Sequence, residues 1–193
     1  MALPREYAGE NCSIARALEV IGERWTLLIV RDAFYGVSRF SDFRDHLRIP
    51  RAVLTERLHL LVEHDILARV TAASGRDEYS LTAKGLRLWP AIWSLITWGD
   101  EYYTADGQRR RFTHAGCGGV VTAEADGRCE ACGARPQPDR LTVHPRAERS
   151  WAGEKTDPVS RALSVPHRLL TPIQPTPIQP APIQPTPTPR TPA

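Results

Sequence analysis

Four residues in the second half of the chain have the types and the spacing of metal ligands. The pattern H-x2-C-x11-C-x2-C begins at His114 and continues through Cys117, Cys129 and Cys132. Structural zinc sites hold Zn²⁺ in a tetrahedron of cysteine and histidine ligands. Two turns that each carry two ligands, separated by about ten to twenty residues, are typical of a zinc ribbon. The spacing therefore predicts a structural Zn²⁺ site, with no open position for a catalytic water.

Three alternatives stay open for this segment. His144 is a second candidate for the histidine ligand. A disulfide, either Cys129–Cys132 or Cys117–Cys129, would use the same cysteines, although a reducing cytoplasm disfavours it. The third alternative is a ribbon that has lost its metal.

The sequence shows no catalytic constellation. The six histidines are scattered, and no glycine-rich phosphate-binding loop follows a predicted strand. We therefore do not predict an enzyme.

Two short amphipathic helices are predicted on either side of Pro50. Proline restricts the residue before it and suits the start of a helix, so the stretch Arg48-Ile49-Pro50 separates them. The apolar residues of each helix recur at helical spacing, and these are Phe40, Phe43 and Leu47 in the first and Leu54, Leu58, Leu61 and Val62 in the second. The residues expected to point away from the second apolar face are Ala52, Thr55, Glu56 and His59, with Arg51 near the N-terminus and Arg57 at the flank.

Two strands are predicted after these helices. They run from Leu67 to Ala72 and from Glu78 to Leu81, around a polar turn. Helix, turn, helix and hairpin are the parts of a winged helix-turn-helix, whose second helix enters a DNA major groove. A small α+β domain of another function would show the same periodicity, so the pattern alone leaves DNA binding open.

Several motifs resemble, in matching order, those of HxlR-type transcriptional regulators. They are CSIARALEVIGERWTLLIVRD from Cys12, RFSDF from Arg39, VLTERL from Val53, EYSLT from Glu78, and Lys84-Gly85. The resemblance spans roughly residues 11 to 104 and implies a MarR-like winged helix-turn-helix in a homodimeric bacterial repressor or activator. Two positions depart from the family pattern. Pro50 stands where a serine N-cap is frequent, and Asp65 stands where the helix usually ends at a glycine. Neither change argues against the fold, because aspartate tolerates the left-handed conformation better than most residues.

The resemblance also implies a set of contacts to double-stranded DNA. The recognition helix is expected over about Arg51 to His64. The candidates for contacts at base edges are Arg51, Thr55, Glu56 and His59, and Ala52 on the same face is a further candidate for contact with DNA. Ser38, Arg39 and Arg57 are expected to contact phosphates, and Arg76 at the tip of the wing is expected to reach the minor groove or the backbone.

Cys12 lies far from the other three cysteines in the sequence. Some HxlR-type regulators sense oxidants or electrophiles through a cysteine near this position, which implies a redox or small-molecule effector. We expect Asn11 to cap a helix from about Cys12 to Ile21, and a helix N-terminus favours a thiolate. The alternative is a small apolar packing residue.

A helix from Thr82 to about Tyr103 is predicted, with Pro90 kinking or splitting it. It is apolar on more than one side. Together with the resemblance, this predicts a homodimer interface formed with the N-terminal arm or the first helix. Burial within its own domain is the alternative.

Composition and patterning divide the chain as follows: 1–10 an N-terminal arm, 11–104 the DNA-binding and dimerisation domain, 105–149 a zinc-ribbon-like segment, and 150–193 a linker with a disordered Pro-rich tail. The fold class is α+β and mostly helical. The net charge of the 193 residues is only +3, and no run of apolar residues is long enough for a membrane span or a signal peptide. We expect a cytoplasmic protein without a membrane partner. The second functional hypothesis is a zinc-stapled module for protein interactions.

Overall fold

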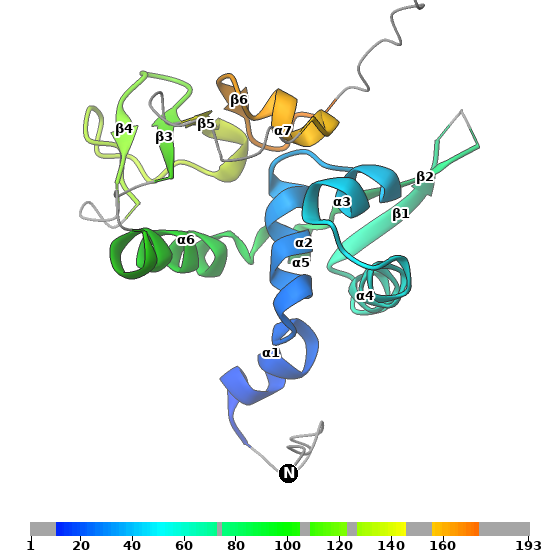
Figure 1. Cartoon of the computed structure of the whole chain (residues 1–193). Coiled ribbons are helices and arrows are strands. Elements are labelled where there is room, and N and C mark those ends of the chain that lie inside the picture. Colours follow the sequence, from blue (N-terminus) through cyan, green and yellow to red (C-terminus); the bar gives the residue numbers. More distant parts are fainter. Residues whose placement is uncertain (1–10, 73–74, 105–108, 123–126, 146–155, 174–193) are drawn as a thin grey trace, which may run out of the picture.

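The computed structural model describes residues 11–72, 75–104, 109–122, 127–145 and 156–173. The first part is a winged helix-turn-helix unit, in which a two-stranded wing extends outward from a group of helices (Figure 1). Its elements are, in order, α1 (Ser13–Ile21), α2 (Arg24–Phe34), α3 (Phe40–Leu47), α4 (Arg51–Glu63), β1 (Leu67–Thr71), β2 (Asp77–Leu81), α5 (Ala83–Leu86) and α6 (Trp89–Tyr103).

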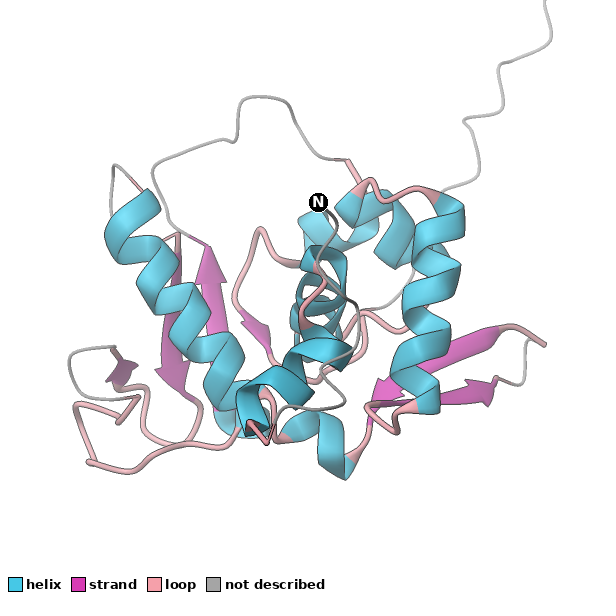
Figure 2. Cartoon of the chain, turned by 90° about the horizontal axis from the view of Figure 1, so that it is seen from below, coloured by secondary structure: helices cyan, strands magenta, loops and turns pink. Residues whose placement is uncertain are grey.

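The second part is a small antiparallel sheet with the strand order β4-β3-β5-β6. It lies at the opposite side of the helices from the wing (Figure 2). Its elements are β3 (Arg110–His114), β4 (Val120–Val121), the short 3-10 helix η1 (Pro138–Arg140), β5 (Leu141–Pro145), α7 (Pro158–Ala162) and β6 (His167–Arg168).

The apolar face of α4 anchors the helix-turn-helix unit. Leu54, Leu58 and Leu61 are at most 1% exposed, and they pack into the same core as Phe43 of α3 and Ile29 of α2. Burial of such side chains contributes about 1.5–3 kcal/mol each. The opposite face of α4 is therefore fixed in direction, because the helix cannot rotate without exposing these leucines.

The wing is extended by the chain that precedes α3. Leu67 pairs with Leu81 and Thr71 with Asp77 across β1 and β2. On the other edge of β2, the Tyr79 N–H donates to the Ser38 carbonyl at 2.8 Å, and Arg39 forms an isolated bridge with Glu78. The wing and the entry to α3 are thus joined by backbone pairing.

Aromatic side chains join the two parts of the molecule. The ring of Trp89 in α6 lies 5.0 Å from that of Phe34 in α2 and 6.0 Å from that of Phe112 in β3. Trp93 lies 5.1 Å from Phe112, edge to face. Such pairs contribute about 0.5–1.5 kcal/mol beyond their buried area. The small sheet therefore packs against α6 through these aromatic rings.

Residues 156–173, which we call the strap, connect the sheet to the helix-turn-helix unit. Its residues Val159, Leu163, Leu169 and Ile173 are buried. The strap passes so close to Gly36 that a Cβ there would lie 1.8 Å from the Thr171 carbonyl oxygen. Gly36 also has φ +87°, which favours glycine.

Most of the predicted helices and strands lie where the sequence placed them. Arg48 and Asp65 adopt the left-handed conformation, with φ 53° and 55°, and so end α3 and the turn after α4. The Thr82 hydroxyl caps α5 by accepting from the Gly85 N–H. Pro90 splits the predicted long helix into α5 and α6, because it occupies the first turn of α6.

Two expectations are corrected by the structure. Cys12, and not Asn11, is the N-cap residue of α1, and it makes no side-chain capping hydrogen bond. Within the range 150–193, expected to be linker and tail, residues 156–173 form α7 and β6 on buried anchors. The predicted arm at 1–10 and the repeats from 174 onward lie outside the described residues. No helix among the described residues is long and apolar enough to cross a membrane.

Candidate nucleic-acid interface and metal centre

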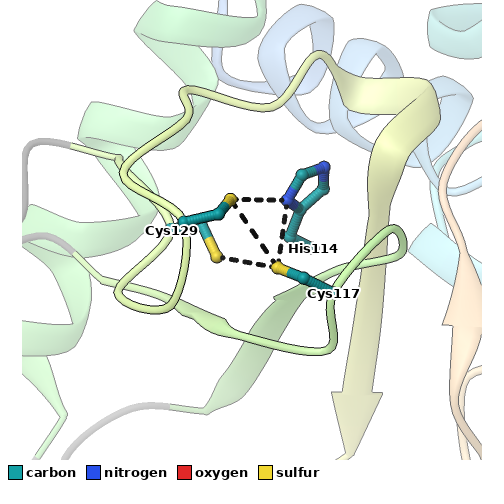
Figure 3. A group of neighbouring side chains, drawn as sticks. His114, Cys117 and Cys129 are labelled. Carbon is teal, nitrogen blue, oxygen red and sulfur yellow. Dashed lines mark hydrogen bonds between the residues drawn. The ribbon is translucent and has the colours of Figure 1, made fainter.

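The four predicted ligands lie together at one end of the small sheet. His114 ends β3 and Cys117 lies in the turn toward β4, while Cys129 and Cys132 lie in the turn that follows β4. Their ligand atoms, which are His Nδ1 or Nε2 and Cys Sγ, all lie within 4.8 Å of one another. Figure 3 shows His114, Cys117 and Cys129 directed toward a common point.

The individual distances are short and similar. The Cys117 Sγ lies 3.4 Å from His114 Nδ1, 3.4 Å from Cys129 Sγ and 3.7 Å from Cys132 Sγ. The Cys132 Sγ lies 3.3 Å from His114 Nδ1. A disulfide needs about 2.05 Å between the two sulfurs. The cysteines are therefore free thiols, and the structure does not contain either disulfide considered above.

The two ligand-bearing turns have the same backbone design. Gly118 follows Cys117 with φ +74°, and Gly133 follows Cys132 with φ +69°. The N–H of each glycine donates to the carbonyl of the first ligand in its own turn, at 2.8 Å. Glycine allows the left-handed step that closes each turn at no steric cost. The repeated HxxCG and CxxCG patterns are thus two copies of one local structure.

Gly119 brings the two turns close together. A Cβ at this position would lie 2.5 Å from the Cys129 Sγ and 2.6 Å from the Ala131 Cβ. Any larger residue would push the second turn away from the first. The close approach of the two turns therefore leaves room only for glycine at position 119.

The cluster favours a thiolate at Cys129. Burial raises the pKa of this thiol, but hydrogen bonds from the Cys132 N–H, the Cys117 thiol and the Ala131 N–H lower it to about 6. The pKa of Cys117 is raised, because its hydrogen bond from the Gly119 N–H is outweighed by the neighbouring sulfurs and by burial. Because Zn²⁺ binds cysteine as the thiolate, a cation at this site would displace the remaining thiol protons.

His144 lies outside the cluster. Its Nε2 is 2.8 Å from the Thr113 hydroxyl, across the β3–β5 pairing. Burial, followed by the charge of Arg111, lowers its pKa. Of the two candidate histidines, the structure places only His114 among the cysteines.

The predicted base-contacting residues lie on the exposed face of α4. Arg51, Ala52, Thr55, Glu56 and His59 are all exposed, opposite the buried leucines. Arg51, Thr55 and His59 recur every four residues, so they form one row. The Thr55 hydroxyl donates to the Arg51 carbonyl at 3.0 Å, and the Arg51 guanidinium lies over the Phe40 ring of α3.

The residues predicted to contact phosphates differ in their exposure and in their partners within the protein. Arg76 is exposed in the wing, and Ser38 is partly buried where its carbonyl pairs with β2. Arg39 donates to Glu78 at 3.2 Å, and the mostly buried Arg57 pairs with Glu56. Arg39 and Arg57 are thus engaged within the protein.

An apolar stripe on α6 faces solvent. Leu95, Trp98 and Tyr102 are 48%, 51% and 62% exposed, and Tyr103 is also exposed. On α1, Ile14 and Leu18 are 70% and 48% exposed, and no residue of this helix is buried. Cys12 is partly buried at the start of α1.

The sequence reasoning missed the residues of the strap. Asp157 caps α7 and Pro158 occupies its first turn. Aspartate followed by proline is a recognised helix start, and this signal marks α7 in the sequence. Asp157 reaches the otherwise buried His46 of α3 at 3.2 Å, which no local pattern indicates.

Comparisons with known proteins agree with this arrangement. A model of the HxlR-like helix-turn-helix family matches residues 20–107. A Mycobacterium tuberculosis protein named as an HTH-type transcriptional regulator is 43% identical over 148 residues, which cover 74% of this chain and 90% of the relative. An alignment of this length must continue past residue 107 into the small sheet.

Other matches cover about half of this chain. The HTH-type transcriptional regulator YvaP of Bacillus subtilis is 33% identical over 90 residues, or 45% of this chain and 83% of that protein. Among solved structures, the transcription factor PA1607 is 45% identical, with a TM-score of 0.48, over 49% of this chain and 68% of that one.

Proposed function

This chain belongs to the HxlR-like helix-turn-helix family of transcriptional regulators, and from that premise we propose that it binds specific sites on double-stranded DNA as a homodimer. The observation that supports the proposal is that α4 has one buried apolar face and one exposed polar face. Its leucines are fully buried, and its polar residues lie in a row on the opposite side. A helix held in this way can present a fixed set of side chains to a major groove.

Within the proposal, each residue type suits a particular contact. Arg51 would donate to guanine, His59 and Thr55 would contact neighbouring base edges, and Glu56 would accept from cytosine. Arg76 would reach the backbone or minor groove from the wing, as a contact that positions the protein without reading sequence. Arg39 and Arg57 would first have to exchange their carboxylate partners for phosphates.

The test is selection of bound duplexes from a random pool, followed by binding titrations at several salt concentrations. We expect a palindromic site, because a two-fold homodimer reads two equivalent half-sites. Arg51→Ala should relax the preference at one position of each half-site and cost about 1–3 kcal/mol there. Arg76→Ala should weaken all sequences alike and lower the salt slope by about one.

Arg87→Ala is the matched control, because it removes an exposed positive charge that lies between α5 and α6 and not on α4 or the wing. It should leave site preference unchanged. Failure to select any site, together with bound zinc, would move the assignment to a zinc-stapled protein-interaction module.

We place the homodimer interface on the apolar stripe of α6 together with α1. The support is the exposure of Leu95, Trp98 and Tyr102 on one side of a helix. Trp98→Asp should convert the dimer to monomers in sedimentation velocity. Val165→Asp, which changes an equally exposed apolar residue of the strap, is the control and should leave the dimer intact.

We further propose that His114, Cys117, Cys129 and Cys132 hold one structural Zn²⁺. Bond lengths of about 2.3 Å to sulfur and about 2.0 Å to nitrogen give tetrahedron edges of roughly 3.8 Å between sulfurs and 3.5 Å between sulfur and nitrogen. Four of the six distances between these atoms are 3.3–3.7 Å, close to those edges, and all six are within 4.8 Å. The metal would cross-link the two turns and would leave no position for a substrate. One zinc per chain by atomic emission is the expected result, and protein purified without added metal that contains none would contradict it.

A further inference from the structure

Three ionisable side chains from three separate elements meet where the strap covers the helix-turn-helix unit. His46 of α3 lies between Asp32 of α2 and Asp157, the residue that caps α7. The Nδ1 of His46 is 3.2 Å from the Asp157 Oδ1, and its Nε2 is 3.9 Å from the Asp32 Oδ2. One imidazole ring thus has a carboxylate at each nitrogen, and α7 packs directly on α3 around it (Figure 1).

Asp157 is held in its charged form. Burial raises the pKa of this carboxyl, but hydrogen bonds from the Ser160 hydroxyl and N–H, together with His46, lower it overall. The Ser160 N–H donates to Asp157 at 2.9 Å and the Ser160 hydroxyl donates at 2.7 Å. The carboxylate therefore reaches His46 from a fixed position at the start of α7.

Asp32 supplies the second carboxylate from the interior. It is completely buried, and its Oδ1 accepts from the Arg31 Nε at 2.9 Å and Nη2 at 2.7 Å. Within the described residues its Oδ2 has no hydrogen-bond partner, and it faces His46. A buried carboxylate oxygen without a donor is costly, so an N–H on the Nε2 of His46 is favoured there.

A third acidic residue adds to the negative charge near His46. Asp42 lies on the same helix as His46 and is 9% exposed. Burial raises its pKa, the Ser41 hydroxyl and Arg39 lower it, and Asp45 and Asp157 raise it further. The groups that face His46 from α2, α3 and α7 are therefore mostly acidic, with Arg31 already engaged by Asp32.

The strap has further anchors on both parts of the molecule. The Leu170 N–H donates to the Phe34 carbonyl at 2.8 Å, and the Ile173 N–H donates to the Gly36 carbonyl at 3.1 Å. On the other side, the Leu169 N–H donates to the Leu141 carbonyl at 2.9 Å, and β6 pairs with β5. The strap is thus the segment that ties the ligand-bearing sheet to the end of α2 and to α3.

We propose that His46, as an imidazolium between Asp32 and Asp157, holds the strap against α3 in a proton-dependent way. We call these three residues the latch. The neutral ring has only one N–H, so deprotonation removes the hydrogen bond that His46 donates to one of the two carboxylates. The latch is then weakened at its α7 end, where Asp157 can regain water. Because α3 directly precedes α4, the opening changes the support of the helix that carries the exposed polar row.

The pH range in which the contact between His46 and Asp157 forms follows from the protonation of these two side chains. Two adjacent carboxylates favour the charged form of a histidine. Under this proposal the contribution of His46 is complete below the ordinary histidine pKa of about 6.5 and is lost as the pH rises above it. The pKa of Asp157 is lowered, so its contribution is lost only as the pH falls through that lowered value. The latch is therefore closed in mildly acidic solution and loosens on the alkaline side.

The experiment is NMR of the full chain across pH 5 to 9, following the His46 ring and the exchange of the Leu170 and Ile173 amides. We expect His46 to titrate above about 6.5. The protection factors of the two amides, corrected for intrinsic exchange, should fall about tenfold for each unit by which the His46 pKa exceeds that value. Protection that is constant with pH, or a His46 titration below 6.5, would overturn the proposal.

Two variants separate the latch from general stability. His46→Gln should remove the pH dependence of strap protection, whereas His64→Gln, an exposed histidine at the end of α4, should retain it. If His46→Gln does not fold, Asp157→Asn gives the same test, because asparagine still caps a helix but carries no charge. Strap protection in Asp157→Asn that keeps the wild-type pH dependence would contradict the assignment.

Discussion

In α4, three leucines at helical spacing are fully buried beneath the exposed polar row, whereas the second ligand-bearing turn has almost no apolar support. From residue 128 to residue 135, only Cys129 is buried. The strand β4 that precedes this turn is two residues long. Small segments that bury little apolar surface need a metal or a disulfide to hold one structure. The helix-turn-helix unit is therefore positioned by its core, and we expect the two turns to be positioned by the proposed metal.

The largest effect that we predict from this contrast is the loss of metal binding when one ligand is replaced. Cys129→Ser should abolish metal binding, because it removes the buried sulfur of the cluster. Metal content should fall from about one zinc per chain to nearly zero. Cys12→Ser is the control and should retain the metal, since Cys12 lies at α1, away from the cluster.

The second prediction concerns the core of the helix-turn-helix unit. Leu58→Ala should lower the free energy of unfolding by about 2–5 kcal/mol, because Leu58 is 1% exposed and its removal leaves a cavity. Chemical denaturation measures this change. Metal stoichiometry of the folded variant should stay the same, and a loss of zinc would show that the two regions are not held independently.

The third prediction tests the close approach at Gly119. Gly119→Ala should weaken zinc binding at least about tenfold, because its Cβ would lie 2.5 Å from the Cys129 Sγ and must displace a ligand. Gly99→Ala is the control, since nothing lies within 4 Å of a Cβ at that position of α6. Competition with a chromogenic chelator measures both. Equal affinities would mean that the second turn can shift freely.

The smallest predicted effect is the loss of a helix cap. The Thr82 hydroxyl accepts from the Gly85 N–H at 3.0 Å and donates to the Asp65 carbonyl at 2.6 Å. Thr82→Ala should lower the free energy of unfolding by about 1 kcal/mol. Thr82→Ser retains the hydroxyl and should recover most of that loss.

The same contrast explains which features could be predicted from the sequence. The exposed row on α4 followed from leucines that recur at helical spacing, and the clustering of His114 with three cysteines followed from the spacing of these four residues. The contact between His46 and Asp157 could not be predicted, because it joins residues 111 positions apart without a periodic pattern. Asn11 was expected to cap α1, but the helix begins one residue later, and helix ends are set by local geometry that propensity describes only weakly.

Hydrogen exchange measured by mass spectrometry, before and after zinc chelation, tests the difference between the two regions most directly. We predict that peptides covering residues 110–121 and 127–145 lose protection when the metal is removed, while peptides covering α4 and the wing keep it. The buried leucines of α4 and the paired strands β1 and β2 require no metal. Two results would contradict this difference between the regions. One is loss of protection in α4 at the same chelator concentration, and the other is full protection of residues 110–121 and 127–145 without metal.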